Sequence, residues 1–302
     1  MGLIDRTISL ALPAVPKPIV GYFSRPYIAG ETVDEALGVV RELDAQGAMS
    51  TLDILGEFIS GLDEAEANAR AYLDMFDRLE ADSPQQANVS VKLTALGLLL
   101  DRDACLQSMR RLVKRADAAG RFVRIDMEDS PCTDATLEIY RALREEFGDR
   151  RIGVVLQSRL FRTLEDVERL AGPGVNFRLC KGIYLEPDAI AHTDDAGIRR
   201  AFVDALDRMF AAGAYVGIAT HDAWLVERAE ELIAKHGLGR DQYEFQMLLG
   251  VLAPLRRRLI ADGHRLRVYV PYGPHWYAYS VRRLRENPQI AGHVMRALFR
   301  RG

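Results

Sequence analysis

Short runs of apolar and β-branched residues alternate with longer amphipathic stretches along most of the chain. From Met49 onward the two kinds of segment repeat with a period of about 30 residues, which is typical of successive β-α units. The strands predicted from the short runs are 50–55, 88–93, 122–126, 153–156, 176–179, 215–219, 243–248 and 266–270. Apolar residues three and four positions apart predict helices over 65–79, 104–118, 134–146, 163–171, 196–211, 223–236 and 252–262.

Eight strands, each followed by a helix, fit a (β/α)8 barrel of the TIM type, and they also fit a doubly wound open sheet. The two standard phosphate-binding loops of open sheets are missing from the sequence. No G-x-G-x-x-G follows a strand, and no G-x-x-x-x-G-K-[ST] occurs. The barrel is therefore the favoured interpretation.

The first 47 residues differ in character from the rest. Prolines punctuate the start of the chain, and Thr32 and Glu35 then form a capping box for a helix that runs to about Ala45 and is closed by Gly47. We predict a helical N-terminal arm over 1–47 and a catalytic barrel over 48–302.

Polar side chains stand at or near the carboxyl ends of seven predicted strands, which is the end where barrel enzymes build their active sites. One such residue is explained equally well by contact with solvent, but seven in register are harder to explain in that way. In chain order they are Lys92, Asp126, Gln157, Arg178 with Lys181, Thr220-His221-Asp222, Glu244 with Gln246, and Tyr269.

The segment 267–287 holds the densest polar and aromatic chemistry. It predicts a strand, a turn over Pro271-Tyr272-Gly273-Pro274 and a helix over 275–286 that carries Tyr279, Arg282, Arg283 and Glu286 on one stripe. The stripe is either a solvated face with Arg–Glu pairs or a binding surface on which two guanidinium groups flank one carboxylate.

Composition narrows the functional classes. The chain has 302 residues, of which 48% are hydrophobic, and a net charge of −3, which argues against a general nucleic-acid binder. Three cysteines without a CxxC pair suggest neither a zinc cage nor a disulfide framework, so a reducing cytosol fits best. His221 has no metal-ligand spacing to another histidine, and we expect no metal site.

The same positions carry a resemblance to a known family. A strand-end Tyr269, a Pro-x-Gly turn, Tyr279 and the run Arg-Arg-Leu-x-Glu-Asn over 282–287 closely resemble the signature of the proline dehydrogenases. The resemblance extends from about residue 49 to 288. It implies a (β/α)8 barrel that carries FAD and oxidises L-proline to Δ1-pyrroline-5-carboxylate.

The resemblance also implies roles for single residues. Asp126 and Arg178 match positions treated as catalytic, with Arg178 near the reactive nitrogen of the flavin. Positions matching substrate contacts are Lys92, Arg282 and Arg283 for the carboxylate, Tyr184, Leu248, Tyr269 and Tyr279 for the ring, and Glu286 as a partner of the arginines. Positions matching flavin contacts are Met127, Gln157, Arg178, Lys181, Gly182, Ile183, Thr220 and His221.

Two departures from the family pattern stand beside this site. Ile183 replaces an alanine that is common after the strand-5 lysine and glycine, and Ser158-Arg159 replace an Ala-Tyr pair. The larger side chain of Ile183 is expected to narrow the site or to shift the flavin slightly.

The resemblance further implies that quinone accepts the electrons and that a pyrroline-5-carboxylate dehydrogenase acts next in the pathway. We expect a cytoplasmic protein, with peripheral contact at the inner face of the cell membrane as an alternative. The tail 289–302 has an apolar stripe beside three arginines, so it either packs over the barrel or binds weakly to a membrane surface.

Two other functions remain open from the residues alone. A Schiff-base aldolase would use Lys92 or Lys181 as the nucleophile and the paired arginines for a phosphate. A non-catalytic amino-acid-binding module would bind without flavin and without turnover. A yellow purified protein that is bleached by L-proline would separate the dehydrogenase from both.

Overall fold

The computed structural model describes residues 17–57, 59–82 and 86–286, and over this part of the chain it contains a closed barrel of eight parallel strands in chain order. The strands are β1 Met49–Ile54, β2 Ala87–Val91, β3 Val123–Ile125, β4 Ile152–Gln157, β5 Asn176–Cys180, β6 Tyr215–Ala219, β7 Tyr243–Leu248 and β8 Leu266–Tyr272. β8 pairs with β1 and closes the barrel, which confirms the predicted fold class.

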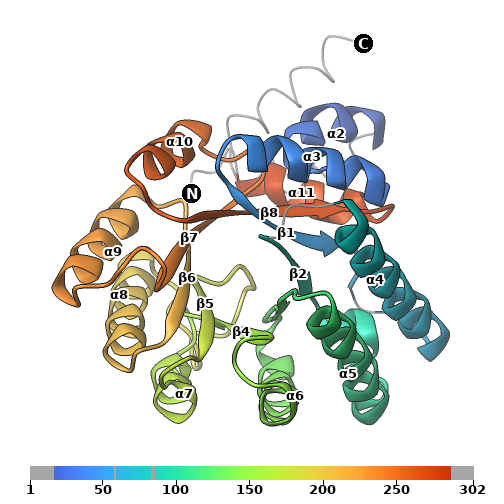
Figure 1. Cartoon of the computed structure of the whole chain (residues 1–302). Coiled ribbons are helices and arrows are strands. Elements are labelled where there is room, and N and C mark those ends of the chain that lie inside the picture. The colour runs from blue at the N-terminus through green and yellow to red at the C-terminus, as the bar shows by residue number, and fades with distance from the viewer. Residues whose placement is uncertain (1–16, 58, 83–85, 287–302) are drawn as a thin grey trace.

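Over the residues that the structure describes, seven helices surround the strands (Figure 1). They are α4 Leu62–Asp82, α5 Arg102–Ala118, α6 Thr133–Phe147, α7 Thr163–Leu170, α8 Asp195–Ala211, α9 Ala223–Lys235 and α10 Ala253–Ala261. Short 3-10 turns cover Arg25–Tyr27, Leu93–Leu96 and Ser130–Cys132. The outward side chains of the strands, such as Val89, Val154 and Phe177, are fully buried between the barrel and this ring.

At one side of the barrel lie α2 Lys17–Ser24, α3 Val33–Ala45 and α11 Trp276–Glu286 (Figure 1). The predicted capping box of α3 is present, since Glu35 N donates to Thr32 Oγ1 and Thr32 N donates to Glu35 Oε2. α2 and α11 approach closely, because a Cβ on Gly21 would lie 3.3 Å from the ring of Trp276.

α3 shares the core of the barrel, since its Leu37 and Val40 belong to the same buried cluster as the strand side chains. The boundary at residue 47 stays a prediction. The amphipathic tail 289–302 lies outside the described residues. Within the part that the structure describes, no helix combines the length and the apolar character needed to cross a membrane.

The predicted turn over Pro271-Tyr272-Gly273-Pro274 is wrong in its first two residues. β8 continues through Pro271 to Tyr272, where the sequence predicted a turn, and Pro271 pairs in register with Asp53 of β1. Proline is tolerated at this position because β7, the other neighbour of β8, has already ended. The Tyr269 carbonyl still accepts from Leu249 N just after β7. Two residues later, the Pro271 carbonyl accepts from Ala29 N instead. The missing N–H of Pro271 therefore removes no ladder hydrogen bond.

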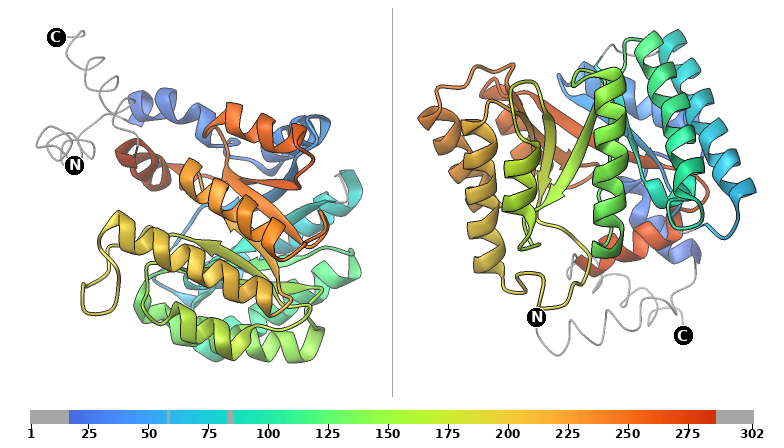
Figure 2. Two further views of the ribbon diagram at one scale, coloured as in Figure 1. Left: turned by 90° about the vertical axis from the view of Figure 1, so that its left-hand side faces the viewer. Right: turned by 90° about the horizontal axis from the view of Figure 1, so that it is seen from below.

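The interior of the barrel is polar. Hydrogen bonds between strands that are not neighbours, such as Arg178 of β5 to Ser90 of β2, show that these side chains point inward. Figure 2 shows α11 and the loop between β5 and α8 at the same end of the barrel, the end where the strands finish. The candidate site lies at this end.

Candidate active site

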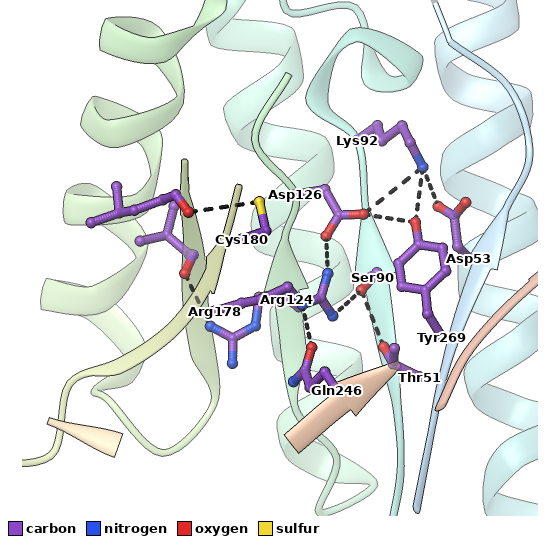
Figure 3. Close-up of polar contacts among 12 residues, drawn as sticks. Thr51, Asp53, Ser90, Lys92, Arg124, Asp126, Arg178, Cys180, Gln246 and Tyr269 are labelled. Atoms are coloured by element: carbon purple, nitrogen blue, oxygen red, sulfur yellow. Dashed lines mark hydrogen bonds and ion pairs between the residues drawn. The ribbon is translucent and has the colours of Figure 1, made fainter. Parts of the chain in front are cut away.

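Four strands bring a cluster of charged and phenolic groups together near the carboxyl end of the barrel (Figure 3). Lys92 follows β2, and its Nζ donates to Asp53 Oδ1 of β1 at 2.7 Å and to the Tyr269 hydroxyl of β8 at 3.1 Å. Tyr269 in turn donates to Asp126 Oδ2, just after β3, at 2.8 Å. The structure thus joins Lys92, Asp126 and Tyr269 and adds Asp53.

Arg178 is held on three sides by residues of three other strands (Figure 3). Its Nη1 donates to Asp126 Oδ1 at 2.6 Å, its Nη2 donates to Ser90 Oγ at 3.0 Å, and its Nε donates to Gln246 Oε1. The guanidinium carbon also lies 5.4 Å from the centre of the Tyr269 ring. Because three of its donors are engaged, the plane of the guanidinium group is fixed.

The protonation states follow from burial and neighbours. Burial disfavours the charged ammonium of Lys92, but Asp53 and Asp126 outweigh this effect and raise its pKa. Burial raises the pKa of Asp53 to about 6, against the opposing effect of Lys92. Burial, with Asp126 and Asp53, also raises the pKa of the Tyr269 phenol well above its usual value, so the hydroxyl stays a donor.

Lys92 keeps capacity for a ligand. An ammonium group has three N–H donors, and the bonds to Asp53 and Tyr269 use two of them. One N–H therefore remains for a ligand, although the Asp126 carboxylate, whose Oδ2 lies 3.9 Å from Lys92 Nζ, stands close by.

A second polar group lies at the ends of β5 and β6. Lys181 and Arg199 both pair with Asp222, and Arg199 does so through Nε at 2.7 Å and Nη2 at 3.1 Å. Thr220 Oγ1 accepts from Asp222 N, and His221 Nε2 accepts from Leu248 N at 2.9 Å. The predicted flavin contacts Lys181, Thr220 and His221 therefore share one edge of the site.

Gly182 sits where an added side chain would force Gln157 to move and would adopt a strained backbone conformation. Its φ is +93°, and a Cβ there would lie 2.8 Å from Gln157 Oε1. Gln157 is buried at the end of β4 and donates through Nε2 to the Glu128 carbonyl at 2.8 Å. Met127 is buried beside Asp126 in the chain. Gly182 thus lets the backbone approach Gln157 closely.

The loop after β5 is tied to neighbouring loops. Glu186 accepts from Ser130 N at 2.8 Å and from Ser130 Oγ at 2.6 Å, and the carbonyl of Tyr184 accepts from Arg159. Arg159, one of the departures from the family pattern, therefore holds the backbone of a predicted substrate contact. Ile183, the other departure, is 46% exposed.

The remaining predicted substrate residues follow β7 and β8. Leu248 is half-buried at the end of β7, and Tyr279 of α11 is buried with Tyr27 and Leu55. Arg282, Arg283 and Glu286 belong to α11 by their backbone, but their side chains lie outside what the structure describes.

Sequence reasoning missed Asp53, Ser90 and Arg199 as parts of the site, and it listed Asp222 among the polar strand ends without giving it a role. Asp53 is the clearest, because it is the charged residue in the otherwise uncharged strand-1 run Ser50–Leu55 and is completely buried. A carboxylate inside a predicted buried strand needs a cationic partner, and this requirement could have been read from the sequence.

Among the described residues, no group of three histidine, cysteine or acidic side chains is placed to hold a metal ion.

Comparison with known proteins decides the family. The sequence model of the proline dehydrogenase family matches residues 36–296. The chain belongs to the proline dehydrogenase family. A proline dehydrogenase of Deinococcus radiodurans is 36% identical over 277 residues, which cover 91% of this chain and 89% of the relative. Proline dehydrogenase 1 of Bacillus subtilis strain 168 is 35% identical over 280 residues, which cover 92% and 91%.

A solved structure agrees with this chain in fold. The proline utilization A protein (PutA) of Bdellovibrio bacteriovorus, whose crystal structure was determined after inactivation by N-propargylglycine, superposes with a TM-score of 0.81 at 25% identity. The match covers 88% of this chain but 33% of that protein, so this chain corresponds to about a third of the larger PutA chain.

Proposed function

We propose that this protein is an FAD-dependent proline dehydrogenase that oxidises L-proline to Δ1-pyrroline-5-carboxylate. The observation that carries the proposal is the convergence of Lys92, Asp126, Arg178 and Tyr269 in one hydrogen-bonded cluster of a barrel from this family. Proline-dependent reduction of a soluble dye by the purified protein, with FAD added, tests it. A protein that holds FAD but transfers no electrons from proline would contradict it.

The donor set at the ends of β5 and β6 fits FAD. Lys181 and Arg199 supply positive charge for a diphosphate, and the Thr220 hydroxyl and the Gln157 amide supply hydrogen bonds. Because Gly182 has no side chain, its backbone can lie close to Gln157, and no Cβ occupies this edge of the proposed FAD site. When bound, FAD supplies the acceptor for the hydride that leaves the proline ring.

The protein's own residues orient the substrate. Lys92, with Arg282 and Arg283 as the proposed partners, binds the carboxylate by charge-assisted hydrogen bonds. Tyr269, together with Tyr184, Leu248 and Tyr279, encloses the ring.

The charged residues of the cluster serve the reaction itself. Asp126 fixes Arg178 and Tyr269 and offers its carboxylate to the incoming ammonium group. Arg178 would place positive charge beside the reactive nitrogen of the flavin, where the electrons arrive. The ring ammonium first gives its extra proton to water, and the nitrogen lone pair then forms the C=N bond as the hydride leaves the ring carbon for the acceptor.

The Schiff-base alternative is disfavoured by the charges around Lys92. A nucleophilic lysine needs a lowered pKa, but Asp53 and Asp126 raise the pKa of Lys92.

The partners beyond the substrate are inferred from the family resemblance. We propose quinone as the electron acceptor, reached transiently at the membrane surface, and a pyrroline-5-carboxylate dehydrogenase that consumes the product.

Gly182→Ala is expected to weaken FAD binding by about tenfold, the factor that corresponds to 1.4 kcal/mol. The added Cβ would collide with Gln157 Oε1, and the φ of +93° is strained for alanine. Gly174→Ala is the matched control, because Gly174 has a φ of +89° but a Cβ there would meet Asp149 at an ordinary 3.6 Å. Titration of apoprotein with FAD measures the effect. Equal FAD affinity in the two variants would show that Gly182 is not needed for the cofactor.

We expect the protein to favour L-proline over trans-4-hydroxy-L-proline by at least about tenfold in kcat/KM. The ring of Tyr269 would meet an added hydroxyl with an apolar face and leave it without a hydrogen-bond partner, at a cost of about 1–3 kcal/mol. Tyr269→Ser is expected to lose most of this preference. Tyr269→Phe, which keeps the ring but not the hydroxyl, is expected to retain it. Equal kcat/KM values for both substrates in the parent protein would rule this selectivity out.

A further inference from the structure

We propose that Glu244 and Gln246 of β7 are positioning residues that fix the orientation of Arg178, and that the rate of proline oxidation depends on this orientation. The inference rests on the proposed function and adds two residues, below the ligand-facing cluster, that contact neither substrate nor cofactor in that proposal. Both are buried, with 2% and 5% of their surface exposed.

Glu244 is a fixed acceptor in the barrel interior. Its two oxygens accept from Arg267 Nε at 2.7 Å and Nη2 at 3.0 Å, and Oε2 also accepts from the Tyr215 hydroxyl at 2.9 Å. Burial alone would raise the pKa of Glu244, but Arg267 outweighs it and holds the pKa at about 2. The carboxylate is therefore ionised at neutral pH and can only accept hydrogen bonds.

The charge of Glu244 decides which way the amide of Gln246 points. Gln246 Nε2 donates to Glu244 Oε1. The reverse orientation would place the amide oxygen against the carboxylate, so it is excluded. Gln246 Oε1 must then face the other way, where it accepts from Arg178 Nε.

Gly217 of β6 makes room for this arrangement. It pairs in register with Arg178, and a Cβ on Gly217 would lie 2.4 Å from Gln246 Nε2. Any larger residue there would push the amide away from its present position. The absence of a side chain at Gly217 therefore helps to keep the Gln246 amide in contact with Arg178.

The consequence concerns the guanidinium plane of Arg178. Asp126 and Ser90 hold Nη1 and Nη2, while Gln246 holds Nε, the donor nearest the aliphatic stem. Without the hydrogen bond from Nε, the guanidinium group keeps its charge and its ion pair with Asp126, but it loses one of the three hydrogen bonds that fix its orientation. The reaction step should therefore slow, while proline binding through Lys92 should change little.

Gln246→Leu and Gly217→Ala test the proposal in different ways: the first removes the acceptor and the second displaces it. Both are expected to lower kcat for L-proline by about tenfold, the factor that corresponds to 1.4 kcal/mol, with KM within about twofold of the parent. Both are expected to lower the reduction potential of the bound flavin, because the cation is held less firmly beside it. A purely structural role for these residues would not move the potential.

Tyr215→Phe is the matched control. It removes one hydrogen bond to Glu244, but at Oε2, the oxygen that Gln246 does not use. We expect a kcat and a flavin potential close to those of the parent. If Gln246→Leu and Gly217→Ala match Tyr215→Phe in both quantities while the parent oxidises proline, the positioning role is wrong. A parent that neither holds FAD nor oxidises proline would instead overturn the proposed function on which this inference rests.

Discussion

Arg178→Lys is expected to lower kcat for L-proline by about 100-fold. Lysine keeps the positive charge but loses the planar fork, so it cannot reach Asp126, Ser90 and Gln246 together. Each lost hydrogen bond to a charged group costs about 1.5–3 kcal/mol, and two such losses amount to roughly 100-fold or more. Steady-state kinetics with a soluble dye acceptor measure the change.

Arg121→Lys provides the control for this substitution. Arg121 is also buried, and it donates to the carbonyls of Leu79 and Ala87, which lie outside the candidate site. Its replacement is expected to affect stability more than kcat. If Arg178→Lys keeps kcat within about threefold of the parent, the guanidinium fork is not required and charge alone suffices.

Arg267→Met is expected to give the largest loss of stability, about 3–5 kcal/mol of the free energy of unfolding. Arg267 is buried, and besides Glu244 it donates to the carbonyls of Ser50 at 2.8 Å and Gln86 at 2.6 Å. Its removal leaves the Glu244 carboxylate unpaired inside the barrel. Urea unfolding of the parent and the variant at neutral pH gives the difference.

The double variant Arg267→Met with Glu244→Gln separates the ion pair from packing. Removing both charges leaves no unpaired ion, so the double variant is expected to recover more than half of the loss. A double variant no more stable than Arg267→Met would show that the cost lies in the lost backbone contacts instead.

The acid dependence of stability provides an independent check on Glu244. Its pKa in the folded protein is about 2, below the usual value of 4.5, so its contribution is complete above about pH 4.5 and is lost as the pH falls towards 2. Without Arg267, burial raises the pKa of Glu244 in the variant, so the stability difference between the parent and Arg267→Met should begin to narrow above pH 4.5 and continue to narrow as the pH falls towards 2. A difference that stays constant would mean that Glu244 is not ionised in the parent.

The regular elements could be predicted from the sequence because their signals are local. All eight strands were found, β6 and β7 with their bounds unchanged, and the capping box of Thr32 and Glu35 is formed as expected. The end of β8 could not be predicted, because a proline is tolerated at residue 271 only where β7 has already ended. That condition depends on a neighbouring strand and not on the local sequence.

The partners within the site are not visible locally either. Arg178 and Gln246 lie 68 residues apart, and Asp126 and Tyr269 lie 143 residues apart. The polar strand ends indicated which residues face the site, but not that Asp53 would pair with Lys92 or that Glu244 would orient an amide. The pairs Arg178–Gln246 and Asp126–Tyr269 exist because closure of the barrel brings non-neighbouring strands face to face across its interior. Asp53 meets Lys92 because their strands β1 and β2 pair side by side.

The central claim is that L-proline delivers its electrons to a flavin held at this end of the barrel. The most direct measurement is the absorption spectrum of the purified, FAD-loaded protein without oxygen, before and after L-proline is added. We predict the yellow band of oxidised flavin before the addition and its loss after it, with the parent bleached much faster than Arg178→Lys. A spectrum that L-proline leaves unchanged would contradict the claim.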